Sequence, residues 1–172
     1  DHTVTGLILA NRNEFIRNAE VAFADQGLVG RVTYDYDRRY FAEVNVGYNG
    51  SENFPPGLQY GFFPAFAGGW LISNEKFMTE SALSQVISNL KLRASLGWVG
   101  NDKSNDRFIF LQDFSNAGGY TFGTGNNYYN GIRQGDIANK VVTWEVARKF
   151  NIGFESEFFN GLFGLNVDLF GE

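Results

Sequence analysis

The sequence predicts an all-β fold in which antiparallel up-and-down strands form part of a transmembrane β-barrel, with one short helix in a periplasmic turn. Apolar and polar residues alternate along most of the chain, and a period of two indicates strands. The alternating segments run for about 9–14 residues, longer than an average strand and near the length that crosses a bilayer. Long connections fall on one end of the meander and mostly tight turns on the other, an asymmetry typical of outer-membrane barrels.

Seven segments are expected to be strands, and they make residues 1–172 a single partial barrel. The second and third form a hairpin around a charged turn at 37–38, with Val44 and Val46 on its apolar face. Residues 12–25 and 50–59 are expected to be loops, and Pro and Gly mark the second of them. The predicted strands are 3–11, 26–36, 39–49, 59–72, 90–100, 142–155 and 163–170.

The other connections differ in character. Residues 73–89 break the alternation, and Leu83, Val86 and Ile87 stand at helical spacing, which predicts one short helix there. Residues 101–140 carry most of the Gly and Asn and are expected to form a long loop. A turn at 159–161 precedes the last strand. The chain begins and ends in strand-like text, so we expect it to be a piece of a longer protein.

The composition excludes several classes of function. The net charge of −5 argues against a nucleic-acid partner, which requires a basic surface. The absence of Cys removes disulfides, Cys-ligated zinc and thiol catalysis, and His2, the only histidine, has no second His or Cys nearby. We therefore expect no enzymatic activity, metal or cofactor in this segment. No apolar run is as long as a membrane helix, which needs about 18 residues, and the first residues do not resemble a signal peptide.

The two faces of the predicted strands differ in chemistry. Arg148 would face outward, which is tolerable only above the bilayer. A polar face is equally expected of a soluble or surface-displayed β-sandwich that binds a ligand, so this alternative stays open. Aromatic residues gather near the short-turn end (Tyr34, Tyr36, Tyr40, Trp70) and the long-loop end (Tyr48, Trp98, Trp144), as in interfacial girdles. In a barrel the polar face lines the lumen, with Arg31, Glu43, Asn45, Arg93, Glu145 and Lys149.

Three stretches, 27–78, 87–102 and 142–170, carry a resemblance to a known family. The opening hairpin followed by "NGSENF", "GFFPAFAGGW", "LKLRASLGWVGN" and "TWE…FNIG", in that order, resembles the barrel of SusC/RagA-type TonB-dependent transporters of the Bacteroidetes outer membrane. "IANKVV" at 137–142 departs from the Asn-Pro-like lead-in common in that family.

The resemblance implies a barrel of about 22 strands with a plugged lumen. It implies import of a glycan fragment or a peptide, with energy delivered through TonB and a SusD-like surface lipoprotein as a lid. We expect the plug domain, the segment that contacts the TonB complex and the remaining strands to be absent from this chain. Outer-membrane lipid would surround the wall.

The stretch "GGYTFGTGNNYYNG", residues 118–131, is the candidate for ligand contact. Aromatic rings interleaved with amides can stack on the faces of an oligosaccharide or grip a peptide backbone. In the alternative interpretation, these rings pack the loop against neighbouring loops or against the lipoprotein. The candidate substrate-binding residues are Tyr120, Phe122, Asn126, Asn127, Tyr128 and Tyr129.

Two acidic patterns are interpreted as polar surface. Glu155 and Glu157 share one strand face about 6.6 Å apart, superficially like a glycosidase pair, but no framing motif supports catalysis. Asp102, Ser104 and Asp106 resemble the start of a calcium loop, but the Gly and distal Glu that such a loop requires are missing.

Overall fold

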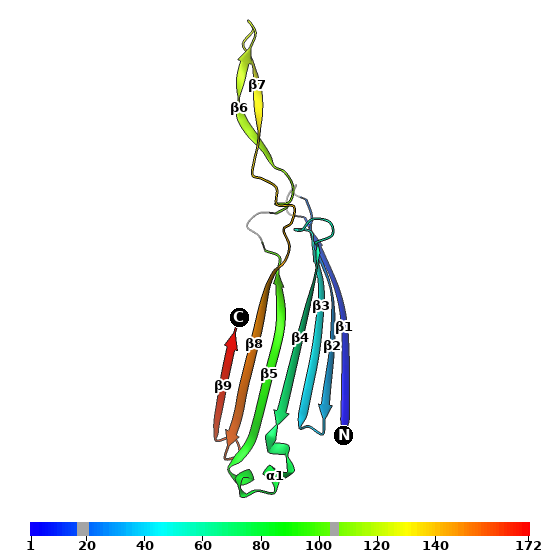
Figure 1. Ribbon diagram of the computed structural model, residues 1–172, viewed down its shortest axis with the longest axis vertical. Coiled ribbons are helices and arrows are strands. Elements are labelled where there is room, and N and C mark those ends of the chain that lie inside the picture. Colours follow the sequence, from blue (N-terminus) through cyan, green and yellow to red (C-terminus); the bar gives the residue numbers. More distant parts are fainter. Residues whose placement is uncertain (17–20, 104–106) are drawn as a thin grey trace.

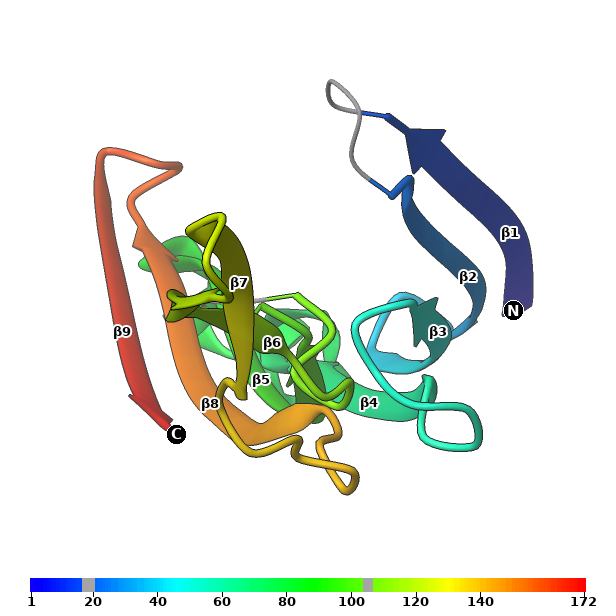
Figure 2. The ribbon, with the colours of Figure 1, turned by 90° about the horizontal axis from the view of Figure 1, so that it is seen from above.

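Seven strands form one antiparallel sheet in the order β1-β2-β3-β4-β5-β8-β9. The computed structural model describes residues 1–16, 21–103 and 107–172. The strands run along the long axis of the molecule (Figure 1), and from above they follow an open arc (Figure 2). Such a curved meander is a section of barrel wall that does not close on itself. The strands are β1 (His2–Phe15), β2 (Phe23–Tyr36), β3 (Tyr40–Ser51), β4 (Tyr60–Leu71), β5 (Ile87–Asn101), β8 (Glu145–Phe158) and β9 (Phe163–Gly171).

The connection between β5 and β8 contains a second, two-stranded sheet, formed by β6 (Phe114–Phe122) and β7 (Asn127–Gln134). This hairpin projects beyond the seven-stranded sheet (Figure 1). The prediction of a loop throughout 101–140 was therefore wrong. Gly and Asn indicated a loop, but here they form the tight turn of a hairpin, in which Gly123 and Asn126 have φ angles of 74° and 51°.

The helix predicted within 73–89 is present but lies elsewhere in that segment. It is the short α1 (Lys76–Thr79), flanked by the 3₁₀ turns η1 (Ile72–Asn74) and η2 (Ala82–Gln85). Leu83 lies in η2 and Ile87 begins β5, where it pairs with Phe158, so strand pairing overrides the helical spacing. Within the described ranges, no helix is long and apolar enough to cross a membrane.

The two tight turns form where the sequence predicts them. Asp37 and Arg38 have φ angles of 56° and 53°, and Phe159 and Asn160 have 53° and 57°. Asp37 and Arg38 are the central residues of a turn that the Arg39 N–H closes by donating to the Tyr36 carbonyl at 3.0 Å, and positive φ at both matches the twist of the flanking strands. The Asp35 carboxylate accepts a hydrogen bond from the Arg38 N–H at 2.8 Å, which holds the first turn in this conformation.

The exposure of the two sheet faces is the reverse of that in a water-soluble sheet. The polar face, which carries Glu43 and Asn45, is half-buried on β3, whereas the apolar face, which carries Val44 and Val46, is exposed. The alternative of a soluble β-sandwich is therefore wrong, because no second sheet covers the apolar face in the described part of the chain. Among the described residues, the only buried hydrophobic side chains are Phe54 and Met78, and both lie outside the strands.

Aromatic rows border the apolar face at both ends. At the short-turn end Tyr40 stacks between Tyr36 and Trp70, with ring centroids 6.2 and 6.3 Å away, and at the other end Tyr48 stacks on Tyr60 at 5.1 Å. The prediction that Trp144 belongs to the aromatic row at the long-loop end was wrong. Because β8 begins only at Glu145, the alternation does not extend to Trp144.

Trp144 instead packs against aromatic side chains at the long-loop end of the sheet. Its ring lies 5.1 Å from that of Phe63, which has polar-face register in β4, and 5.2 Å from that of Phe54. Its indole N–H donates to the Gln59 carbonyl at 3.2 Å. The last β4–β5 pair is Ala65 with Gly97, so side chains rather than backbone hydrogen bonds fill the space beyond it.

Candidate functional site

One ionic cluster on the polar face joins β2 and β3. The register pairs Arg31 with Asn45 and Thr33 with Glu43, which places their side chains on the same face. Arg31 Nε donates to Asn45 Oδ1 at 2.7 Å, and Asn45 Nδ2 donates to Glu43 Oε1 at 2.6 Å. Arg31 Nε also lies 3.6 Å from Glu43 Oε1. Three of the six residues predicted to line a lumen therefore act as one polar unit.

A second ionic cluster joins β5, β8 and β9. Arg93 forms ion pairs with Glu155 at 2.7 Å and with Asp168 at 2.6 Å, and it donates to Asn151 at 3.4 Å. Gly153 lies opposite Arg93, and a Cβ at that position would stand 2.6 Å from Arg93 Nε and 2.7 Å from Asp168 Oδ1. A side chain at position 153 would displace the ends of the Arg93 and Asp168 side chains, and Glu155 is an ion-pair partner of Arg93.

Small residues separate the two clusters on the polar face, at Ala65, Ala67, Gly69, Ser95 and Gly97. Two clefts of about 450 and 660 Å³ lie over this strip. Lys149, which borders the larger cleft, is 3.5 Å from Glu172, and Glu145 accepts from Asn101 at 3.2 Å. The polar face is thus a shallow surface with charged groups at its sides and little side-chain bulk in the middle.

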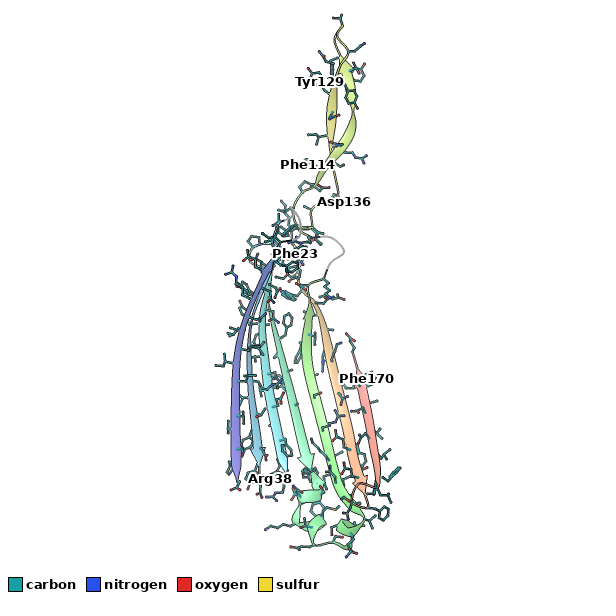
Figure 3. All side chains as sticks on the ribbon, turned by 180° about the vertical axis from the view of Figure 1, so that it is seen from behind. Phe23, Arg38, Phe114, Tyr129, Asp136 and Phe170 are labelled. Carbon is teal, nitrogen blue, oxygen red and sulfur yellow. The ribbon has the colours of Figure 1, made fainter. Side chains whose placement is uncertain are left out.

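The β6–β7 hairpin brings together four of the six candidate substrate-binding residues. Tyr120 pairs with Tyr129 and Phe122 with Asn127, which puts these four side chains on one face, named here the aromatic face. The Phe122 ring centroid lies 5.1 Å from that of Tyr120 and 5.8 Å from that of Tyr129. All four are exposed, and Figure 3 shows Tyr129 far from the seven-stranded sheet.

The other two candidate residues do not join this group. Tyr128 pairs with Thr121 and lies on the opposite face of the hairpin. Its ring covers Gly119, where a Cβ would stand 2.5 Å from Tyr128 Cζ. Asn126 lies in the connecting turn in a left-handed conformation. Strand alternation separates these residues, which sequence proximity had grouped.

A cluster centred on Arg107 lies at the long-loop end of the sheet, and no motif in the sequence predicted it. Arg107 Nη2 lies 2.7 Å from Glu52 Oε1, its guanidinium donates to the carbonyls of Val21 and Ala22 at 3.0 and 2.9 Å, and Cζ stands 3.5 Å from the Phe23 ring centroid. Its partners come from two separate connections, so no local pattern could have predicted it.

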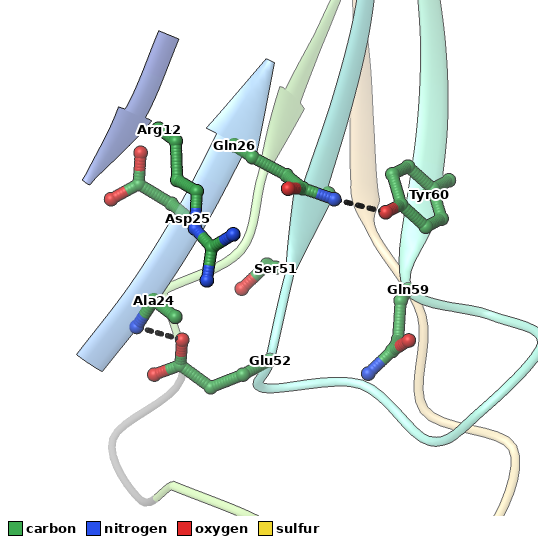
Figure 4. Close-up of a pocket in the computed structure, with 9 residues that line it drawn as sticks. Arg12, Ala24, Asp25, Gln26, Ser51, Glu52, Gln59 and Tyr60 are labelled. Atoms are coloured by element: carbon green, nitrogen blue, oxygen red, sulfur yellow. Dashed lines mark hydrogen bonds between the residues drawn. The ribbon is translucent and has the colours of Figure 1, made fainter. Parts of the chain in front are cut away.

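A cleft of about 230 Å³ adjoins the Arg107 cluster, lined by residues that include Arg12, Asp25, Gln26 and Tyr60 (Figure 4). Gln26 donates to the Tyr60 hydroxyl across it. Nearby, the Asp102 carbonyl accepts from Asn53 Nδ2 at 3.2 Å. Ser104 and Asp106 of the calcium-loop pattern lie outside the described residues, and no group of three His, Cys, Asp or Glu that could hold a metal occurs within them.

A further cluster, named here the Glu75 cluster, lies at the short-turn end of the sheet around Glu75, which is only 8% exposed. Glu75 accepts from the Trp70 indole at 3.0 Å and from Arg39 at 3.2 Å, and Arg39 also pairs with Asp37 at 2.6 Å. Hydrogen bonds from the Tyr40 hydroxyl and the Trp70 indole lower the pKa of Glu75, and the Arg39 charge lowers the pKa of Asp37. The cluster fixes α1 against the β2–β3 turn.

No protein-family model matches the chain. It is 31% identical over 141 residues to the TonB-dependent receptor P39 of Formosa agariphila, covering 82% of this chain and 13% of that protein. It is 30% identical over 140 residues to the TonB-dependent receptor SusC of Bacteroides thetaiotaomicron, covering 81% of this chain and 14% of SusC. The chain therefore spans only a small part of its relatives.

The fold matches solved structures in the same way. A structure of the RagAB peptide transporter superimposes with a TM-score of 0.81 at 20% identity, covering 98% of this chain and 21% of the matched chain. A structure of the RagAB peptide importer in its closed-closed state gives 0.73 at 22% identity, covering 87% and 15%. In sequence and in fold, the chain belongs to the SusC/RagA-like TonB-dependent receptors, of which it is a segment of the β-barrel wall.

Proposed function

We propose that this segment is part of the wall of an outer-membrane importer that takes up oligosaccharides or peptides. The observation that carries the proposal is the reversed sheet, in which the apolar face of β3 is exposed and its polar face is half-buried, while ion pairs join the charged groups of the polar face. A bilayer stabilises such a surface because lipid covers the apolar side chains, and the polar residues then line an aqueous lumen. Arg31, Glu43, Asn45, Arg93, Glu145 and Lys149 are the proposed lumen residues.

The proposal extends to the partners of the whole protein. One relative is the TonB-dependent receptor SusC, and the matched structures are those of a RagAB peptide transporter and a RagAB peptide importer. This supports a SusD-like surface lipoprotein as the partner at the long-loop end. TonB would supply energy through parts of the protein beyond this segment, which carries no catalytic role of its own.

The aromatic face of the hairpin is the proposed contact for substrate or for the lipoprotein. Its exposed rings and the Asn127 amide offer stacking and hydrogen bonding together, as recognition of sugars or peptide backbone requires. The hairpin stands well clear of the sheet (Figure 1), which gives it access to molecules outside the barrel.

Uptake by cells tests the proposal. A strain lacking the full-length gene is complemented with wild type, with Tyr120→Ala/Tyr129→Ala, or with Tyr128→Ala as the control on the opposite face. Uptake of a fluorescent oligosaccharide mixture and of a fluorescent tryptic peptide mixture is then measured. We expect wild type to restore uptake of one mixture and the aromatic-face variant to lose about tenfold, since each stacking ring contributes about 0.5–1.5 kcal/mol.

Two results would contradict the proposal. If wild type restored uptake of neither mixture, the proposal that the protein imports oligosaccharides or peptides would be wrong. If Tyr128→Ala lowered uptake as much as the aromatic-face variant, the two faces would not differ and the assignment of the aromatic face would fail.

A further inference from the structure

Arg148 is a cation on the apolar face of the sheet. It lies in β8 between Val146 and Phe150, whose side chains share that face and are 55% and 44% exposed. The register places it opposite Trp98 of β5, which also shares the face. A charge on a lipid-facing surface is costly at the centre of a bilayer and is tolerated close to the headgroups.

The Arg148 guanidinium makes no hydrogen bond, ion pair or cation–π contact within residues 1–16, 21–103 and 107–172. Arg31, Arg93 and Arg107, by contrast, all form ion pairs with carboxylates. Arg148 therefore has five N–H donors available on a face where the neighbouring side chains of Val146, Phe150 and Trp98 carry no hydrogen-bond acceptor.

The height of Arg148 on the sheet agrees with a position at the membrane border. Phe158 ends β8 at the short-turn end, and the strand from Phe158 to Arg148 rises about 33 Å at about 3.3 Å per residue. A tilt of about 40° reduces this rise to about 25 Å, the height of the outward apolar band of such barrels. Arg148 therefore lies about one band height from the short-turn end of β8.

We propose that Arg148 binds the phosphate group of a lipid in the outer leaflet, an inference that rests on the function proposed above. The planar fork of the guanidinium matches two phosphate oxygens. Trp98 beside it is a residue type that prefers the membrane interface. Val146, Phe150 and Ile152 offer an exposed apolar track for the acyl chain of the same lipid, which free phosphate would not use.

Native mass spectrometry of the full-length protein tests this site. The wild type and Arg148→Gln, Arg148→Lys and Arg38→Gln are equilibrated with phosphatidylcholine bicelles that contain lipid A, and the lipid A retained per protein is counted. Arg38 is the matched control, since it lies in the β2–β3 turn at the opposite end and its side chain has no partner within the described residues.

We expect Arg148→Gln to retain about fivefold less lipid A than wild type, Arg148→Lys to fall between them, and Arg38→Gln to equal wild type. With dephosphorylated lipid A, wild type and Arg148→Gln should be equal. Excess inorganic phosphate should not displace the lipid. Equal retention by wild type and Arg148→Gln would overturn the proposal and would indicate that a carboxylate elsewhere in the protein pairs with Arg148.

Displacement of lipid A by inorganic phosphate would also overturn the proposal and would indicate a site for free phosphate. Each variant is checked for heat-modifiable migration on gels, which reports a folded barrel. A wild type that never forms a folded barrel in membranes would refute the proposed function itself. A folded wild type that binds lipid A independently of Arg148 would refute only this site.

Discussion

The seven-stranded sheet and the β6–β7 hairpin are both built from alternating residues, yet they differ in what supports them. Each inner strand of the sheet is hydrogen-bonded on both sides, and ionic clusters such as that of Arg93 cross three strands. The hairpin strands pair only with each other, and nearly all of their residues are exposed. A two-stranded ribbon is marginally stable alone, so the hairpin can adapt to a ligand while the sheet keeps its shape.

The largest expected effect is the difference in stability between a lysine placed on the apolar face and a lysine placed at the adjacent residue on the polar face. Val32 is 53% exposed on the apolar face near the middle of β2, and Thr33 lies on the polar face opposite Glu43. In the full-length protein folded in vesicles, Val32→Lys should lower the free energy of unfolding by about 2–4 kcal/mol, whereas Thr33→Lys should change it by less than about 1 kcal/mol. Urea titration followed by tryptophan fluorescence measures both. A larger loss for Thr33→Lys would mean that the faces are assigned the wrong way round.

The space beyond the last β4–β5 pair should tolerate no added bulk. A Cβ at Gly100 would stand 2.0 Å from Phe63 Cζ, whereas a Cβ at Gly68 would meet nothing closer than 3.9 Å. Gly100→Ala should therefore lower the free energy of unfolding by about 1–3 kcal/mol in the same titration, while Gly68→Ala should have little effect. Adding Gly100→Ala to a Phe63→Ala protein should cost less, and an undiminished cost would show that Phe63 is not the cause.

The Glu75 cluster, at the short-turn end of the sheet, predicts that the free energy of unfolding depends on pH. Because the pKa of Glu75 is lowered in the folded state, its contribution is complete above the ordinary carboxyl value of about 4.3 and is lost as pH falls through the folded value. The stability difference between wild type and Glu75→Gln should thus be constant from about pH 7 to about pH 5 and shrink below that. Urea titrations across this range measure it, with the exposed Glu80→Gln as control. A difference that stays constant to the lowest pH would contradict the assignment.

Removal of the hairpin should have the smallest effect on stability. When a short Gly-Ser linker replaces residues 114–134, the free energy of unfolding should change by less than about 0.5 kcal/mol, because the hairpin pairs with no strand of the sheet. Uptake in the complementation assay should fall at least as far as in the aromatic-face variant. A marked loss of stability would show that the hairpin supports the wall and would remove the distinction between the two regions.

Local patterns predicted most of the sheet. Alternation along each strand and the turn at Asp37 and Arg38 depend on neighbours in the sequence, so the strands appear within a few residues of where they were expected. The hairpin at 114–134 was missed because Gly and Asn indicate both loops and the tight turns of hairpins. Trp144 was misplaced because alternation was extended past the first residue of β8.

The side-chain clusters could not be predicted in the same way. The contact of Arg107 with Glu52 joins residues from different connections, and that of Arg39 with Glu75 joins a turn to a helix. Such pairs depend on how loops fold over the ends of the sheet, which no single stretch of sequence determines. The shared face of Tyr120 and Tyr129 needs only the hairpin register, so it would have followed once the hairpin was recognised.

The step from β5 to β8 has a consequence for the order in which the wall assembles. Every other pair of neighbouring strands in the sheet is also adjacent in the chain, whereas β5 and β8 are separated by residues 102–144. Closing that longer connection costs more chain entropy than closing a tight turn, and contacts distant in sequence form more slowly. The strands β1 to β5 and the β8–β9 pair should thus form as two blocks, and the ladder from Ile87 to Asn101 should be the last to close.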